Sequence, residues 1–210
     1  MKYSKVVCIG RNYADHAKEL NNPVPSEPLL FIKPADTLVP FEDPIAVGGH
    51  SCDVHYELEI AVLIGKKLKN ADAVDASIAI DAVGLALDLT LRDLQNQLKA
   101  QGHPWEKAKS FDASCPVSAF IPNDNLDLTD LHLALTIDGE LRQSGHSSQM
   151  LTPIVELLQY ASRFFTLNPG DVVLTGTPAG VGVLNPGDQL NASLANKQGQ
   201  LLTVSTVVQA

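Results

Sequence analysis

Three carboxylates on two successive apolar segments are the residues of this chain whose types and spacing are best suited to chemistry. Glu57 and Glu59 belong to the segment at residues 55–65, and Asp88 belongs to the next apolar run, at residues 83–90. An acid inside an apolar run is costly to bury unless it has a partner. A divalent cation bound by all three carboxylates would supply a partner for each of them.

Strand geometry would bring the first two carboxylates to a common face. Side chains alternate between the two faces of a strand, so we expect His55, Glu57 and Glu59 on one face and aliphatic residues on the other. A half-exposed strand with a solvated face would carry the two glutamates equally well, and Asp88 shifts the balance toward a metal. Mg²⁺ prefers oxygen ligands, and Mn²⁺ accepts the same set. The sequence therefore predicts a metal-dependent enzyme with Mg²⁺, or Mn²⁺ in its place.

A histidine and a glutamate three residues apart form a second candidate pair. His16 and Glu19 lie within residues 13–20, which are typical of a short helix, and residues at this spacing share one helix face. A carboxylate bonded to one ring nitrogen raises the basicity of the other, as a general base acting on water requires. By spacing alone, an exposed histidine with an incidental neighbour is the commoner case. The helix precedes a Pro-rich loop at residues 22–28, so a mobile lid is one interpretation.

Cations and a glycine-rich loop could complete such a site. Most lysines are solvated, but one of Lys33, Lys107 or Lys109 beside a metal could hold a substrate carboxylate or stabilise developing negative charge. Residues 175–182 are rich in glycine but lack the Lys-Ser/Thr ending of a P-loop, which argues against a nucleotide. Backbone N–H groups and the Thr177 hydroxyl could instead bind a carboxylate.

Charge and cysteine content narrow the function classes. The formal net charge of −9 argues against nucleic-acid binding, because a phosphate backbone favours a basic face. An anionic substrate would need a local cation. Cys8, Cys52 and Cys115 are far apart and form no CxxC pair, so a reduced, cytoplasmic protein is expected. Neither a signal peptide nor a membrane-spanning run is apparent, so no membrane partner is expected.

The elements that must position these residues are mostly short strands. Hydrophobic periodicity and turn residues predict a β-rich α+β fold in a single domain over residues 1–210. The loop at residues 102–115 is expected to be irregular. Strands are expected at residues 5–10, 29–33, 55–65, 83–90, 131–137 and 172–175, and helices at residues 13–20, 90–101 and 154–165.

Six motifs in order along nearly the whole chain resemble the fumarylacetoacetate hydrolase family. The similarity is greatest to its short, single-domain members of the acylpyruvate hydrolase and fumarylpyruvate hydrolase type. Each motif alone is weak, and their order, with the acids at the family's metal-ligand positions, makes the resemblance specific. The motifs are GRNYADH at residues 10–16, FIKP at 31–34, HYELE at 55–59, DLTLRD at 88–93, KAKSFD at 107–112 and LTGTPAGVG at 174–182.

The resemblance implies a fold, an assembly and a set of roles. The family fold is a mixed β-roll with a few flanking helices, usually paired into a homodimer. The implied roles are Mg²⁺ or Mn²⁺ ligands at Glu57, Glu59 and Asp88, catalytic residues at His16, Glu19 and Lys109, and substrate-binding residues at Thr177, Arg11 and Asn12.

The resemblance also implies a reaction. A 2,4-dioxo acid, an acylpyruvate or fumarylpyruvate, would be hydrolysed at a C–C bond, and the pyruvate enolate that departs would be stabilised by the metal and Lys109. The same enolate chemistry serves oxaloacetate decarboxylation or tautomerisation, and hydration or isomerisation of 2-oxo-dienoates in aromatic catabolism. Hydrolysis leads because His16 and Glu19 supply what water activation needs. A non-catalytic metal-binding protein is the alternative of a different class, and it would have no use for that pair.

Overall fold

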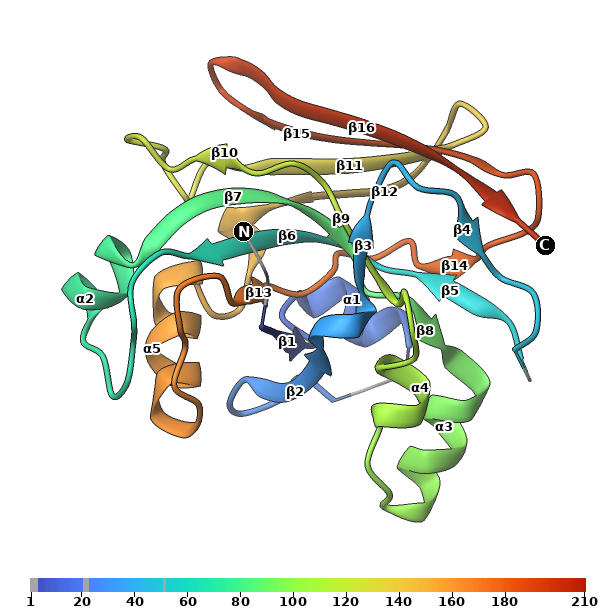
Figure 1. Cartoon of the computed structure of the whole chain (residues 1–210), viewed down its shortest axis with the longest axis horizontal. Helices are drawn as coiled ribbons and strands as arrows, with labels where there is room; N and C mark the ends of the chain where they lie inside the picture. The colour runs from blue at the N-terminus through green and yellow to red at the C-terminus, as the bar shows by residue number, and fades with distance from the viewer. Residues whose placement is uncertain (1–3, 21–22, 51) are drawn as a thin grey trace.

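A curled sheet occupies the middle of the computed structural model, which describes residues 4–20, 23–50 and 52–210 (Figure 1). Among these residues the sheet has eight strands, in the order β2-β1-β13-β6-β7-β9-β3, with β10 paired to β7. Most neighbours are antiparallel, and the β1–β13 and β3–β9 pairs are parallel. The strands are β1 (Lys5–Gly10), β2 (Leu29–Pro34), β3 (Leu38–Pro40), β6 (Leu58–Ile64), β7 (Ile80–Leu87), β9 (Cys115–Val117), β10 (Ile121–Pro122) and β13 (Val172–Leu174).

A second sheet lies across the first, at the top of Figure 1. Within the described residues it has five strands, in the order β12-β11-β15-β16-β4, and a separate three-stranded sheet has the order β14-β5-β8. Asp138 and Gly139 form the turn of the hairpin that joins β11 and β12. These strands are β4 (Ile45–Ala46), β5 (Val54–Tyr56), β8 (Thr90–Leu91), β11 (His132–Ile137), β12 (Glu140–His146), β14 (Gly182–Val183), β15 (Gln189–Asn196) and β16 (Gly199–Gln209).

Short helices flank the sheets and confirm the three helical segments expected from periodicity. Figure 1 shows α3 and α4 together at one end and α5 near α2 at the other. The helices are α1 (Ala14–Glu19), α2 (Ala73–Ile78), α3 (Arg92–Gln101), α4 (Glu106–Lys109) and α5 (Ile154–Phe164), with 3₁₀ turns at Ala35–Thr37 and Ser147–Gln149. Many strands with few helices confirm the β-rich α+β class.

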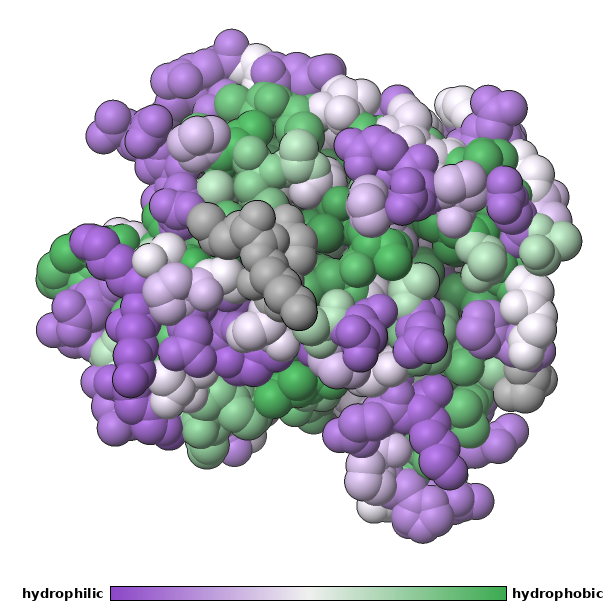
Figure 2. Space-filling model, viewed as in Figure 1, coloured by the Kyte–Doolittle hydropathy of each residue, from purple (hydrophilic) through white to green (hydrophobic). Residues whose placement is uncertain are grey.

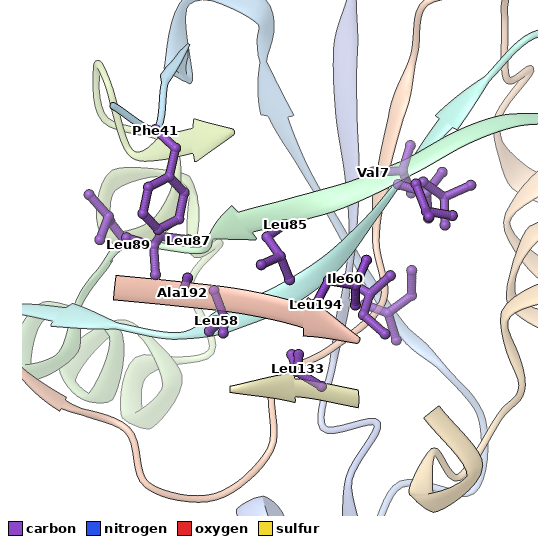
Figure 3. Packing of buried hydrophobic residues seen from close by; sticks show 14 of the residues in the cluster. Val7, Phe41, Leu58, Ile60, Leu85, Leu87, Leu89, Leu133, Ala192 and Leu194 are labelled. Carbon is purple, nitrogen blue, oxygen red and sulfur yellow. The ribbon is translucent and has the colours of Figure 1, made fainter. Parts of the chain in front are cut away.

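The main hydrophobic core fills the space between the two larger sheets. Leu58 and Ile60 of β6 and Leu85 of β7 meet Leu133 of β11 and Leu194 of β15 (Figure 3). All five side chains are fully buried, and removing apolar surface from water is the main force that holds such sheets together. This packing fixes β6 and β7 as the rigid support of the carboxylates at their ends.

The strand expected over residues 55–65 is not continuous, and this part of the prediction is wrong. It is broken at Glu57 into β5 and β6. The Leu58 N–H donates to the side-chain oxygen of Gln143 on β12, at 2.8 Å, which replaces a backbone ladder bond. His55 consequently does not line the cavity that Glu57 and Glu59 line. Alternation along one segment could not reveal a partner that lies far away in the sequence.

Two further expectations need correction. Asp88 does not lie inside a strand, because β7 ends at Leu87, and the Asp88 N–H donates to the Glu57 carbonyl at 2.9 Å. The segment expected to be irregular contains α4. Because β6 begins where β7 ends, with Leu58 paired to Leu87, the three acids come from one end of this strand pair.

Hydrophobic and hydrophilic residues are unevenly distributed over the surface. On the face seen in Figure 2, hydrophilic residues cover the two ends of the molecule and hydrophobic residues gather toward the middle. Cys8, Cys52 and Cys115 are free thiols. Within the described ranges, no helix has the length and hydropathy that crossing a bilayer requires.

Candidate active site

The three predicted metal-ligand carboxylates lie together in the structure. One oxygen from each of Glu57, Glu59 and Asp88 can be chosen so that the three lie within 4.8 Å of one another. The residues are only 4%, 2% and 1% exposed. They line one cavity at the end of the β6–β7 pair. A buried cluster of three acids requires positive charge close by.

Lys109, at the end of α4, supplies part of that charge, and it is the one of the three candidate lysines that lines the cavity. Its Nζ lies 2.9 Å from Glu57 Oε2 and 2.6 Å from Asp88 Oδ2. Burial lowers the pKa of Lys109, but Asp88 and Glu57 outweigh burial and raise it above its usual value. The ammonium therefore stays charged at neutral pH and cannot serve as a base. Lys107, by contrast, is exposed and does not line the cavity.

Arg92 is a site residue that the sequence reasoning missed. Its guanidinium pairs with the Glu57 carboxylate, and its Nη1 donates to Gln95 Oε1 at 2.7 Å. Both residues are buried and line the same cavity. They lie three positions apart, on one face of α3. The sequence does contain an indication that Arg92 belongs to the site, because Arg92 follows Asp88 by four residues and lies at the start of an expected helix.

Lys33 is buried behind the carboxylates and holds several parts of the site together. Its Nζ lies 2.9 Å from Asp88 Oδ1 and donates to the Ser114 carbonyl and hydroxyl oxygens at 3.0 Å each. It also donates to the carbonyls of Lys109 and Leu89. One cation thus fixes Asp88 and the chain segment that carries Lys109. Lys33 does not line the cavity, so its part is positioning.

The two glutamates differ in their protonation. Burial acts to raise the pKa of Glu57, but Lys109 and Arg92 outweigh it and hold that pKa well below its usual range. Burial, Asp88 and Glu57 instead raise the pKa of Glu59 well above its usual range. Without a bound cation, the surroundings therefore favour the ionised form of Glu57 and the protonated form of Glu59.

The donor set fits a hard divalent cation. Asp88 Oδ1 is buried and, although it forms an ion pair with Lys33, it accepts no hydrogen bond of normal geometry. A buried oxygen with an unused lone pair among three carboxylates is what a bound cation would satisfy. Glu57, Glu59 and Asp88 would hold such an ion, and the absence of sulfur and nitrogen from this set favours Mg²⁺ or Mn²⁺.

We predict that metal binding displaces a proton from Glu59. Because the raised pKa favours the protonated form, apparent Mg²⁺ affinity should fall as the pH is lowered, by up to about tenfold per pH unit for one coupled proton. Calorimetry in two buffers of different ionisation enthalpy measures the proton release. Glu59→Gln should remove this release. Binding that is independent of pH between 6 and 8 would contradict the assignment.

The predicted dyad is formed on α1. His16 Nδ1 lies 3.4 Å from Glu19 Oε2, and the Glu19 carboxylate accepts the Gly180 N–H at 3.0 and 3.2 Å. His16 is 5% exposed and lines the cavity. Burial lowers its pKa and Arg92 acts in the same direction, although Glu57 and Glu19 oppose them. A neutral imidazole therefore faces the cavity at pH 7 and can accept a proton.

The glycine-rich loop supports the carboxylates directly. The Gly176 N–H donates to Glu59 Oε2 at 2.5 Å. The Thr177 hydroxyl donates to the Leu58 carbonyl at 2.9 Å and accepts the Gln143 amide at 2.8 Å. Thr177 lines the cavity as expected, but its hydroxyl is already bonded within the protein. Gln143, which the sequence did not single out, joins this loop to the start of β6.

The two residues after β1 have different positions. Arg11 lines the cavity, and its expected role in substrate binding stays a prediction. Asn12 does not line it, and its amide instead bonds the Thr152 carbonyl and N–H at 3.1 and 2.9 Å and the Thr175 carbonyl at 2.9 Å. The structure therefore gives Asn12 a supporting position between chain segments.

Comparison with known proteins bears out the resemblance. The model of the fumarylacetoacetate (FAA) hydrolase C-terminal family matches residues 5–208. The chain belongs to this family. A member of known structure, fumarylpyruvate hydrolase from Pseudomonas aeruginosa in complex with Mn²⁺ and pyruvate, is 34% identical and has a TM-score of 0.91 over 99% of this chain and 90% of that chain. This likeness confirms the expected mixed β-roll.

More similar sequences carry other activities in their names. The oxaloacetate tautomerase YcgM of Escherichia coli (strain K12) is 51% identical over 192 residues, which are 90% of this chain and 88% of that protein. The mitochondrial oxaloacetate decarboxylase of Dictyostelium discoideum is 43% identical over 192 residues, with the same coverage of 90% and 88%. Members of this family are enzymes, and both of these relatives are named for activities on oxaloacetate.

Proposed function

We propose that this protein is a metal-dependent enzyme that interconverts the keto and enol forms of oxaloacetate. The observation that carries the proposal is the pairing of a neutral His16 with a charged Lys109 around three buried carboxylates. Tautomerisation requires one group that moves a proton and another that stabilises an enolate. The oxaloacetate tautomerase relative supports this reaction above C–C hydrolysis.

The charged groups account for the stabilisation of the enolate. A divalent cation held by Glu57, Glu59 and Asp88 would polarise the 2-oxo group and stabilise negative charge on its oxygen. Lys109, kept protonated by Asp88 and Glu57, places a second positive charge beside the same position. Fixed charges in a buried site stabilise a developing anion without reorganisation during the reaction. Arg92 and Gln95 add hydrogen-bond donors to the same cavity wall.

His16 accounts for proton transfer. A neutral imidazole whose Nδ1 faces Glu19 leaves Nε2 to take a proton from C3 of the keto form. The electrons of that C–H bond form the C2=C3 double bond as the C2=O π electrons move onto oxygen, and the His16 imidazolium returns its proton to that oxygen to give the enol. The Gly180 N–H holds the Glu19 carboxylate in place, so both members of the pair are positioned.

Hydrolysis of an acylpyruvate is the second candidate. The same His16–Glu19 pair could activate a water molecule, and the neighbour named fumarylpyruvate hydrolase supports this use. Decarboxylation of oxaloacetate is supported by a relative but makes no demand on His16 as a base. Isomerisation or hydration of 2-oxo-dienoates would use the same metal and lysine. These reactions differ in products, so one assay series separates them.

The deciding experiment follows oxaloacetate in D₂O by NMR, with metal-stripped protein and with protein supplied with Mg²⁺ or Mn²⁺. Metal-dependent exchange at C3 without pyruvate supports tautomerisation. Pyruvate with CO₂ would instead identify a decarboxylase. Acetylpyruvate and fumarylpyruvate are tested in parallel, and their cleavage in place of exchange would identify a hydrolase. If no metal-dependent change occurs with any substrate, the proposal is overturned.

His16→Ala is predicted to slow C3 exchange by about 10²- to 10⁴-fold, because the group that moves the proton is lost. Mg²⁺ affinity should change little, since His16 is not in the carboxylate set. His132→Ala is the matched control, because this histidine bonds Ser144 at a distance from the cavity. Exchange rates from NMR check the predicted loss of activity, and calorimetry checks that the metal affinity is unchanged. Full activity of His16→Ala would remove the assigned base.

We further propose Mg²⁺ as the resident ion, a homodimer, and one catalytic domain in a cytoplasmic protein. The oxygen donor set supports Mg²⁺, with Mn²⁺ as its replacement. The dimer, the single domain over residues 1–210 and the cytoplasmic location follow from the sequence interpretation. Metal analysis of the purified protein and its mass by light scattering test the first two.

A further inference from the structure

Both basic residues of α3, Arg92 and Lys99, lie on the helix face that borders the cavity. Arg92, Gln95 and Lys99 occur at positions i, i+3 and i+7, which share a helix face, and all three line the cavity. The exposed positions of α3 are Asp93, Asn96, Gln97, Ala100 and Gln101, none of which is basic. A solvated lysine would occur on that outer face. The position of Lys99 therefore needs an explanation connected with the cavity.

A third cation reaches the same place from β1. Arg11, the residue directly after this strand, lines the cavity together with Lys99. Arg11, Arg92 and Lys99 line the same cavity. Burial lowers the pKa of Lys99, and the positive charges of Arg11 and Arg92 lower it further. Like charges gathered at a half-buried site repel one another. Such an arrangement is stabilised when an anion binds between them.

The backbone of Arg11 holds that side chain in an unusual way. Its φ is +60°, in the left-handed region that a non-glycine residue adopts at some cost. The next residue, Asn12, is bonded to Thr152 and Thr175, and a Cβ on Gly176 would lie 2.7 Å from the Asn12 Cβ. The surroundings thus hold a costly conformation, and such conformations cluster at functional sites.

Polar side chains of α3 follow one wall of the cavity, and their burial decreases outward along the helix. Arg92 is 8% and Gln95 6% exposed, whereas Lys99 is half-buried, about two helical turns (roughly 10 Å) beyond Arg92. The carboxylate cluster takes the inner end, where Arg92 pairs with Glu57. A ligand whose 2-oxo acid end lies at the carboxylate cluster would direct its far end toward Lys99 and Arg11.

We propose that Lys99 and Arg11 form a subsite for the distal carboxylate of the substrate, so that the enzyme selects short 2-oxo dicarboxylates over 2-oxo acids with an uncharged tail. This inference rests on the proposed function and extends it to the substrate class. Without Lys99 and Arg11, the charges in the cavity would suit a monoanion as well as a dianion. A divalent ion would leave one net negative charge on the three acids, which Arg92 and Lys109 exceed by one positive charge; Lys99 and Arg11 add two more, which favours a dianion. The negative charge of the whole chain makes such a local positive site necessary.

The test compares ligands of equal chain length that differ only in the charge of the tail. The pairs are oxaloacetate with 2-oxobutanoate, and 2-oxoglutarate with 2-oxopentanoate; oxalate, which has no tail, reports on the inner end alone. Binding to Mg²⁺-loaded protein is read in a stopped-flow instrument from the fluorescence of Trp105, the single tryptophan, which lines the cavity. We expect the dicarboxylate to bind about tenfold more tightly in at least one pair.

Lys99→Gln and Arg11→Asn should each remove most of that preference and leave oxalate affinity within about twofold. Asparagine tolerates the left-handed backbone of Arg11. Lys99→Arg should restore the preference, and Lys66→Gln, an exposed lysine outside the cavity, should not affect it. No preference in either pair, or the same preference in Lys99→Gln, overturns the subsite. Failure of oxalate to bind would instead overturn the proposed function.

Discussion

Replacing Asp88 with alanine is expected to abolish the response to Mg²⁺ and to lower kcat/KM for oxaloacetate by about 10³-fold or more. Asp88 is the acid that comes from the end of β7, whereas Glu57 and Glu59 come from the start of β6. Its loss leaves a cation with ligands on one side only. Metal titration of the stripped variant by calorimetry, with C3 exchange as the activity measurement, checks the prediction.

Stability must be separated from catalysis in that experiment. Asp88 forms ion pairs with Lys33 and Lys109, so alanine also leaves two buried cations short of a partner. Asp88→Asn keeps the shape of the side chain and one of its oxygens. This variant should fold better than Asp88→Ala and still lose most of its metal affinity. Asp93→Ala, on the exposed side of α3, is the matched control and should behave as the parent protein. A full Mg²⁺ response in Asp88→Ala would mean that the ligand assignment is wrong.

The metal-ligand acids could be predicted because their signal is local. Glu57 and Glu59 are two residues apart in an apolar segment, and Asp88 ends another, so their types alone indicated a shared partner. The same holds for the helix pair His16 and Glu19, whose spacing placed them on one face. Patterns of two, three or four residues survive folding because backbone geometry enforces them.

The supporting contacts could not be predicted, because they join segments far apart in the chain. Gln143 reaches Leu58 across 85 residues, and Lys33 reaches Ser114 across 81. Nothing in the sequence near Gln143 marks it as a partner of the site. Lys33 was named as one of three candidate cations, but its bonds to Ser114 and to the carbonyl of Lys109 were not expected. The break at Glu57 was missed for the same reason, since Gln143 from the other sheet replaces the ladder bond there. Arg92 was an intermediate case. The helix that contains it was expected, but the sequence did not show that its side chain faces the cavity.

Lys33→Met is expected to be the most destabilising single change behind the site, lowering the free energy of unfolding by about 3–5 kcal/mol. Methionine keeps the length of the side chain but leaves Asp88 and the carbonyls of Ser114 and Leu89 without their donor. Removing one partner of a buried charge costs more than the pair contributes, because the other charge remains desolvated. Urea denaturation of metal-stripped protein measures the change.

Magnesium binding provides a second test of the role of Lys33. A divalent ion bound at Asp88 would neutralise the charge that Lys33→Met exposes, so saturating Mg²⁺ should recover a larger share of stability in the variant than in the parent protein. Lys69→Met is the matched control, since Lys69 also donates to a carbonyl, that of Arg163 at 3.1 Å, but is exposed. Its loss should cost less than about 1 kcal/mol. Equal costs for the two substitutions would mean that Lys33 is dispensable, and the order of Asp88 would then depend on Lys109 alone.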